Sequence, residues 1–338
     1  MQGNIAELLS KLEGVKNIAS REEPLELELE LLDATLSKLS SKTGKGSDVL
    51  GPANIKLLPS NGKEELLHLM MAIGRQLAWP WQLLLSIVAL FKKPVPGDGP
   101  IHLLPRLVRL WSQLHDEPIR NWALIKLGPW DQAIAGSNAI QAAFHRIFLD
   151  ETAARQSRCY ASNCTDVVKF YEMVDLAKIA ERGVELGYPA RILYLSLIMY
   201  IAPRVLREAL AFSPPVLPVR SIAAGCKSAI HFARIALYGI MEQAYYSNVS
   251  VQSKQWVDDL VLRTEGTRQQ VKARLHRAGL ELCKNLVNEG FKVAPKSVII
   301  ASTPLLAKAL ASDFTIAGFP MQWATQAPDL GIARNTRR

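Results

Sequence analysis

Two adjacent aspartates, Asp258 and Asp259, are the residues of this sequence that are best suited to metal chemistry. They stand between apolar neighbours in the stretch QWVDDLVL, which begins at Gln255. Like charges side by side repel each other, and burying them costs free energy unless a cation compensates them. Mg²⁺ prefers a few carboxylates together with waters and substrate phosphates. The segment therefore indicates a magnesium site at a strand turn, and the alternative is an ordinary solvated turn.

A third carboxylate, Asp166, lies 92 residues before Asp258. It falls where a predicted strand ends and a predicted helix follows. Two-metal phosphoryl transfer needs carboxylates from different elements that bridge two cations roughly 3.5–4 Å apart, and this pair would supply them. Tyr171 follows five residues later and is placed to lie under the sugar of a nucleotide. The alternative is that its ring packs in the core.

Short strands and long helices must position these side chains. The pattern favours a helix within Pro24–Leu39, one or two helices over Lys63–Phe91, and a helix-rich first half overall. Proline and glycine clusters predict hairpins over Lys92–Pro100 and Arg204–Arg220. Around the aspartates we expect strands at Arg158–Val168 and Ser297–Ala301, a strand pair over Val251–Arg263, and helices over Gly136–Ala154 and Thr267–Asn288.

The composition limits the class of protein. The chain has 338 residues, a formal net charge of +9 and 49% apolar residues. This apolar content excludes an intrinsically disordered chain, and the charge favours a polyanionic partner. The four cysteines form no CxxC pair, so we expect buried thiols instead of disulfides or a zinc site.

Two apolar windows, Leu77–Phe91 and Ile192–Ala202, are shorter than the roughly 20 residues that a membrane span needs. We therefore expect buried helices and no membrane partner. The start of the sequence has no basic region followed by an apolar one, so we expect a protein that is not secreted.

Several segments together resemble the reverse transcriptase domain of non-LTR retrotransposons, an RNA-directed DNA polymerase. The resemblance covers roughly residues 40–333, and its blocks stand in the family's order. The blocks are Ser47–Pro52, Lys93–Leu104 (KPVPGDGPIHLL), Gly136–Ile140, Asp166 with Tyr171, Ala224–Ser228 (AGCKS), Val257–Asp259, Ala294–Ser297 (APKS) and Asp329–Ile332.

The resemblance implies an α+β fold with the fingers and palm of a right-hand polymerase. It implies a helix-rich N-terminal half and an antiparallel palm sheet with packed helices. The expected parts are an N-terminal helical extension (1–40), a fingers-like part (41–157), a palm-like part (158–333) and a basic tail (334–338). Because little sequence follows the palm-like part, a truncated or degenerate copy is a further expectation.

The resemblance also implies the roles of single residues. Asp166, Asp258 and Asp259 would be catalytic and would hold two Mg²⁺ ions, or Mn²⁺. Tyr171 would be the steric gate that rejects the ribose 2′-OH. The other implied substrate-binding residues are Gly225, Lys92, Lys93 and Lys296, although Lys296 could also be a solvated surface lysine. Arg106 and Arg109 are further candidates for holding the nucleic acid. The implied partners are an RNA template, a DNA or RNA primer and dNTPs, with nuclear or cytoplasmic residence.

Three residues depart from the family pattern. Gly99 stands where the family carries an arginine that grips the triphosphate, Ala224 stands where many relatives have glutamine, and Trp256 is bulkier than the usual aromatic residue. Loss of the guanidinium removes a bidentate phosphate clamp. The alternative function is therefore a catalytically inactive nucleic-acid-binding remnant. A third hypothesis, an unrelated helical interaction protein, predicts that Asp166 and Asp258 do not cluster.

Overall fold

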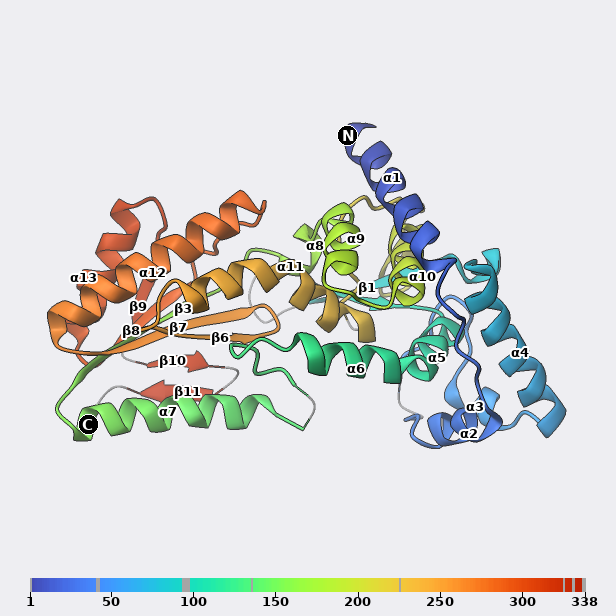
Figure 1. Ribbon diagram of the computed structural model, residues 1–338, viewed down its shortest axis with the longest axis horizontal. Coiled ribbons are helices and arrows are strands. Elements are labelled where there is room, and N and C mark those ends of the chain that lie inside the picture. The colour runs from blue at the N-terminus through green and yellow to red at the C-terminus, as the bar shows by residue number, and fades with distance from the viewer. Residues whose placement is uncertain are drawn as a thin grey trace. The chain divides into compact units, whose positions relative to one another are not determined.

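The computed structural model describes the backbone of residues 2–40, 43–92, 98–134, 136–224, 226–324, 326–329 and 332–335. Helices and two mixed sheets give an α+β structure, as predicted (Figure 1). Contacts divide the chain into two compact units. Unit 1 comprises Met1–Lys126 and Val174–Ala236, and unit 2 comprises Leu127–Met173 and Leu237–Arg338. Each unit thus takes residues from both ranges that the resemblance labels fingers-like and palm-like.

Unit 1 is mainly helical. Its helices are α1 (Gln2–Ala19), α2 (Leu29–Ser37), α3 (Pro52–Lys56), α4 (Ser60–Gln76), α5 (Arg106–Leu114), α6 (Asp116–Lys126), α9 (Leu176–Glu185), α10 (Ala190–Ile201) and the first half of α11 (Lys227–Tyr246). Helix α1 packs against α9 and α10. The Glu22 carboxylate then accepts the backbone N–H groups of Ala190 and Arg191 at 2.9 and 3.0 Å. The N-terminal helix is therefore part of the packed body of unit 1.

A four-stranded sheet completes unit 1, in the order β2-β1-β4-β5. Its strands are β1 (Ser86–Lys92), β2 (Asp98–Leu103), β4 (Arg204–Glu208) and β5 (Ala211–Phe212). Strands β1 and β2 pair antiparallel, β1 and β4 pair parallel, and β4 and β5 pair antiparallel. The pairing of β1 with β2 confirms the hairpin predicted over Lys92–Pro100, although residues 93–97 lie outside the described part of the chain. A hairpin within Arg204–Arg220 is also confirmed, but the expected proline-rich tip is wrong, because Ala209 and Leu210 connect β4 to β5 and Pro214 and Pro215 follow β5.

The prediction of helix over Lys63–Phe91 is wrong in its second part. Helix α4 ends at Gln76, the next residue, Leu77, has a left-handed φ of 52°, and a 3₁₀ turn (Trp81–Leu83) leads into β1. A short apolar run alone does not distinguish a buried strand from a buried helix. The second apolar window lies in α10 and is helical, as predicted. Among the described helices, none has both the length and the apolar character needed to cross a bilayer.

Unit 2 contains a five-stranded sheet in the order β6-β7-β3-β8-β9. Its elements are α7 (Ala139–Arg155), β3 (Cys159–Thr165), α8 (Phe170–Met173), the second half of α11, β6 (Gln252–Trp256), β7 (Asp259–Gly266), α12 (Arg268–Asn288), β8 (Val298–Ala301), α13 (Pro304–Ile316), β9 (Gln322–Ala324), β10 (Gln326–Asp329) and β11 (Ile332–Asn335). Strands β6, β7, β3 and β8 pair antiparallel, as predicted. Strand β9 joins β8 in parallel, so the expectation of a purely antiparallel sheet is wrong at this edge.

Helices α12 and α13 pack against strands β3, β7 and β8. Helix α12 begins at a capping box, in which the side chains of Thr267 and Gln270 each accept the backbone N–H of the other. A Cβ at Gly279 would lie 2.4 Å from the ring of Phe314 and 2.9 Å from the side-chain nitrogen of Asn163. Glycine at this position therefore allows α12 to lie close to both α13 and β3.

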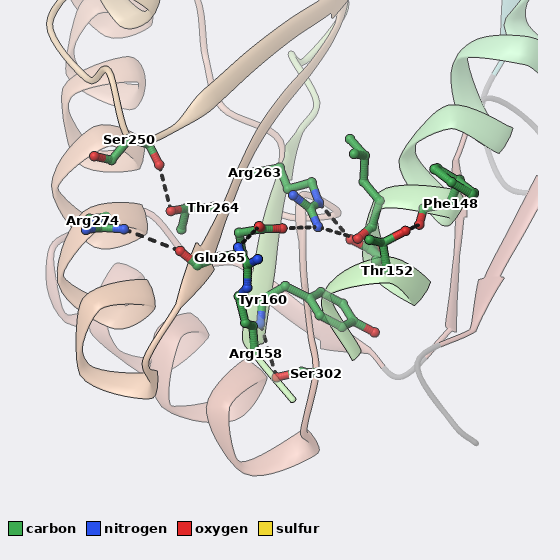
Figure 2. Close-up of polar contacts among 12 residues, drawn as sticks. Phe148, Thr152, Arg158, Tyr160, Ser250, Arg263, Thr264, Glu265, Arg274 and Ser302 are labelled. Carbon is green, nitrogen blue, oxygen red and sulfur yellow. Dashed lines mark hydrogen bonds and ion pairs between the residues drawn. The ribbon is translucent and has the colours of Figure 1, made fainter. Parts of the chain in front are cut away.

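A buried ion pair ties α7 to β7. The Arg263 guanidinium donates to the Asp150 carboxylate at 2.9 Å, to the Leu149 carbonyl at 2.8 Å and to the Glu265 carboxylate at 3.0 Å. The Arg263 and Asp150 side chains are only 3% and 10% exposed. Figure 2 shows Arg263 beside Tyr160, whose ring centre lies 6.0 Å from the guanidinium carbon. These charged contacts fix strand β7, which carries Asp259 at its start.

Candidate active site

Asp166 directly follows strand β3 and is held by backbone contacts on both sides. Its N–H donates to Ser297 Oγ at 3.0 Å, and its carbonyl accepts the N–H of Ala294 at 2.8 Å. The next residue, Val167, forms a bridge with Val293. Ser297 is buried. The position of Asp166 is therefore set by the segment that leads into strand β8.

Asp258 lies in the two-residue turn of the β6–β7 hairpin. The pairing of Trp256 with Asp259 leaves only Val257 and Asp258 outside the ladder. Val257 has a φ of 56°, the left-handed region that such tight turns need and that a β-branched residue rarely adopts. The cost of such a conformation is about 1–3 kcal/mol and is kept only where the surroundings enforce it.

Gln255 enforces this turn from the preceding strand. Its side-chain N–H donates to the carbonyl of Val257 at 2.8 Å. Its backbone N–H donates to the Trp130 carbonyl at 2.8 Å, and its carbonyl accepts the N–H of Gln132 at 2.9 Å. The strained turn is thus held by the Gln255 side chain, and Gln255 is itself held by the backbone of Trp130 and Gln132. Backbone strain of this kind is often found at functional sites.

The strand register brings the two aspartates to the same end of the sheet. Thr165 pairs with Leu260, so Asp166 stands one residue beyond this pair on β3 and Asp258 two residues beyond it on the neighbouring strand. Burial is the main reason that the pKa of Asp258 lies above its usual range, and its own backbone N–H opposes the shift. The negative charges of Asp166 and Glu172 raise this pKa further, and the positive charge of Lys296 lowers it. The two aspartates therefore interact electrostatically.

Lys296 forms an ion pair with Asp166. The Lys296 Nζ lies 3.1 Å from Asp166 Oδ2, and the two side chains are 72% and 28% exposed. The prediction that Lys296 belongs to the neighbourhood of the site is consistent with this contact. With most of its side chain exposed, Lys296 also fits the alternative of a surface lysine that makes one ion pair.

Tyr171 lies beside the same carboxylates. Burial, followed by the charges of Asp258 and Asp259, raises its pKa to about 12. Its ring packs edge to face on Phe170 with 5.6 Å between the ring centres, and Phe170 stacks on Phe291 at 5.2 Å. The tyrosine is thus half-buried, and its phenol stays protonated at neutral pH.

Asp166 and Asp258 form a donor set that suits a shared cation. Mg²⁺ is usually held by one or two protein carboxylates, with waters and substrate phosphates completing its octahedron. Among the described residues, no group of three or more His, Cys, Asp or Glu side chains could hold a metal ion, so a cation here would have two carboxylates and would need further ligands from the substrate or water. Because the charge of Asp166 disfavours ionisation of Asp258, a bound cation would relieve their repulsion. The residues therefore fit Mg²⁺ that is shared with substrate phosphates.

The other predicted site residues lie in unit 1. Lys92 is the last residue of β1, and its side chain lies outside the described part of the chain, while Lys93 and Gly225 lie outside the described residues altogether. Arg106 is buried and donates to Thr43 Oγ1, a placement that disfavours its predicted role in holding the nucleic acid. Arg109 is half-buried and donates to the Gly44 carbonyl at 2.8 Å.

Two residues of the site were missed from sequence. Glu172 acts on the charge of Asp258, and Ser297 holds the backbone of Asp166. The signal for Ser297 was its place beside Lys296 in the APKS block, whereas a charged residue next to Tyr171 gives no signal by itself.

In comparisons with known proteins, no protein-family model and no curated protein matches this chain. A functional conclusion therefore depends on the residues and their geometry.

Proposed function

We propose that this chain is an RNA-directed DNA polymerase domain of the kind found in non-LTR retrotransposons. The proposal is supported by sequence blocks that stand in the order of that family. The single observation that carries it is the strand register, which brings Asp166 and Asp258 to the same end of the β6-β7-β3-β8-β9 sheet. If the chain were an unrelated helical interaction protein, Asp166 and Asp258 would not be expected to lie near each other.

Each residue of the site then has a role in nucleotide addition. Two Mg²⁺ ions, or Mn²⁺, when bound, supply stabilisation of the attacking and leaving oxygens of an in-line displacement. Asp166 and Asp258 would hold these ions, with Asp259 beside them. Tyr171 would occupy the space that a ribose 2′-OH needs, and so favour dNTPs. Lys296 would offer a positive charge to the triphosphate.

The finer fold assignment is part of the same proposal. The β6-β7-β3-β8 sheet with α12 and α13 would be the palm, which the resemblance assigns to 158–333. Sheet β2-β1-β4-β5 would include the fingers segment of the part assigned to 41–157, and Lys92 is the last residue of β1. Gly225 would allow close approach of the substrate backbone. The partners would be an RNA template, a DNA or RNA primer and dNTPs.

A catalytically inactive nucleic-acid-binding remnant is the second candidate. It is favoured by Gly99, which lies in β2 opposite Phe91 and has no side chain to grip a phosphate. Such a remnant keeps the positive charge of the chain, so its binding to RNA would weaken steeply with salt.

Primer extension on an RNA template separates the two candidates. The assay uses purified protein, Mg²⁺ and dNTPs, with Asp258→Asn as the test variant and Asp33→Asn, an exposed aspartate of unit 1, as the matched control. A polymerase extends the primer, loses at least about a thousandfold in rate in Asp258→Asn and keeps its rate in Asp33→Asn. Absence of extension in the wild type, with salt-sensitive RNA binding retained, would support the remnant.

A further inference from the structure

We propose that Lys296 is a displaceable counter-ion of the metal site. Its ammonium pairs with the Asp166 carboxylate when no divalent cation is bound, and it moves to a phosphate of the substrate when a divalent cation binds. This inference rests on the proposed function and deepens it. It assigns one lysine to two partners in succession, and so couples the order in which metal and nucleotide bind.

The first support is the contact itself. Lys296 Nζ stands 3.1 Å from Asp166 Oδ2, the position of a cation that neutralises this carboxylate. The lysine is 72% exposed, and exposed ion pairs contribute little to stability. A contact of this kind is easily exchanged for a divalent cation, which carries twice the charge.

The second support is the charge of the surroundings. Asp258 is subject to the negative charges of Asp166 and Glu172 and to the positive charge of Lys296. The charge of Lys296 therefore acts on Asp258 as well as on Asp166, with which it forms the ion pair. An ammonium in this place competes with a metal ion for the same negative potential.

The third support is the way the backbone of Lys296 is held. The N–H of Ser297 donates to the Ala294 carbonyl at 2.9 Å, which closes a turn around Lys296. Ala294 and Ser297 also bind the backbone of Asp166. The base of the lysine is thus fixed to Asp166, while its long side chain is free to swing. A released ammonium stays within reach of any phosphate that enters the site.

Binding of Mn²⁺ in the absence of nucleotide tests the exchange. The measurement is electron paramagnetic resonance of free Mn²⁺ with wild type, Lys296→Gln and Lys292→Gln. Lys292 is an exposed lysine on the same segment and serves as the matched control. We expect Mn²⁺ to bind about fivefold more tightly to Lys296→Gln, because Mn²⁺ no longer has to displace an ion pair worth about 1 kcal/mol, the energy of two unit charges roughly 4 Å apart in water. The control should bind as the wild type does.

Binding of a dNTP at saturating Mn²⁺ tests the second partner. Lys296→Gln should bind dTTP several-fold more weakly than the wild type, because the freed ammonium is missing. Gain of metal affinity and loss of nucleotide affinity in one variant are opposite effects that misfolding would not produce. Equal or weaker Mn²⁺ binding by Lys296→Gln, with an unchanged melting temperature, would overturn the inference.

Asp166→Asn distinguishes this inference from the function on which it rests. If Asp166→Asn binds Mn²⁺ as the wild type does, the proposed metal site is wrong and the proposed function fails with it. If Asp166→Asn weakens Mn²⁺ binding while Lys296→Gln leaves it unchanged, the metal site stands and only the role of Lys296 is refuted.

Discussion

Tyr171 is the residue of the site whose role can be tested without removing a carboxylate. Its ring lies near Asp258 and Asp259 and is supported by Phe170. We expect Tyr171→Ala to incorporate ribonucleotides far more readily than the wild type, because the ring no longer fills the space of the 2′-OH. Tyr171→Phe keeps the ring and should keep the selectivity. The measurement is the ratio of rNTP to dNTP incorporation, and an unchanged ratio in Tyr171→Ala would refute the gate.

Residue types and spacing pointed to Asp166, Asp258 and Tyr171, and the family resemblance added Lys296; in the structure these four residues lie near one another, while their roles stay predictions. The sequence pattern did not predict the conformation of the hairpin turn that contains Asp258. Tight hairpins usually carry glycine or asparagine where the backbone is left-handed, and this hairpin carries Val257. Its conformation depends on contacts from Gln255, whose carbonyl and N–H pair with the segment around Trp130. Long-range contacts of this kind leave no local pattern in the sequence.

At the scale of elements, the close approach of α12 to α13 and to strand β3 depends on one glycine. A Cβ at Gly279 would lie 2.4 Å from Phe314, a distance that real Cβ atoms do not show. We expect Gly279→Ala to lower the free energy of unfolding by about 1–3 kcal/mol, since overpacking forces the neighbouring side chains to shift.

Gly239 is the matched control for this prediction. It lies in helix α11, and no atom stands within 4 Å of the place that a Cβ would take, so alanine adds helix propensity without a clash. Gly239→Ala should raise the free energy of unfolding by roughly 0.5–1 kcal/mol. Thermal or denaturant unfolding gives both values, and equal stability of the two variants would contradict the close packing of α12.

Elements with strong local signals could be predicted well. The Asn138 side chain caps α7 by accepting the N–H of Gln141 at 2.8 Å, and Thr267 caps α12. The structure of the apolar run over Leu77–Phe91 could not be predicted, because the sequence patterns of a buried strand and a buried helix are alike over so few residues. The end of this run forms strand β1 because it pairs with β2 and with β4, which lies far from it in the sequence.

At the scale of the whole molecule, two buried histidines make unit 1 sensitive to acid. Burial, mainly, lowers the pKa of His102 and of His115 to about 4, and nearby arginines contribute. His102 receives a hydrogen bond from Arg204 at 3.1 Å, and His115 donates one to the Trp111 carbonyl at 2.9 Å. Both histidines are therefore neutral in the folded protein at neutral pH.

The direction of the pH effect follows from proton binding. Between pH 6.5 and about 4 the unfolded chain binds more protons at these histidines than the folded chain, so stability falls as the pH is lowered through this window. Each histidine contributes up to roughly 3 kcal/mol to this loss. When the pH is lowered from about 7 to about 5, we expect the melting temperature of His115→Gln to fall less than that of the wild type. The exposed His68→Gln should behave as the wild type, and equal losses in all three would contradict the prediction.

The division into two units is the feature of the whole molecule that sequence did not reveal. Each unit joins two stretches that are far apart in the chain, so no local change of composition marks the boundaries. The boundary between Met173 and Val174 falls between the two separate helices α8 and α9.

The central claim is that Asp166 and Asp258 act as one metal-dependent site for nucleotide addition. The most direct measurement is a double-mutant cycle of the primer-extension rate on an RNA template, with Asp166→Asn, Asp258→Asn and the double variant. Residues that act as a unit are strongly non-additive. We predict that all three variants lose activity to about the same extent. Extension that survives in Asp166→Asn, or losses that multiply in the double variant, would contradict a shared site.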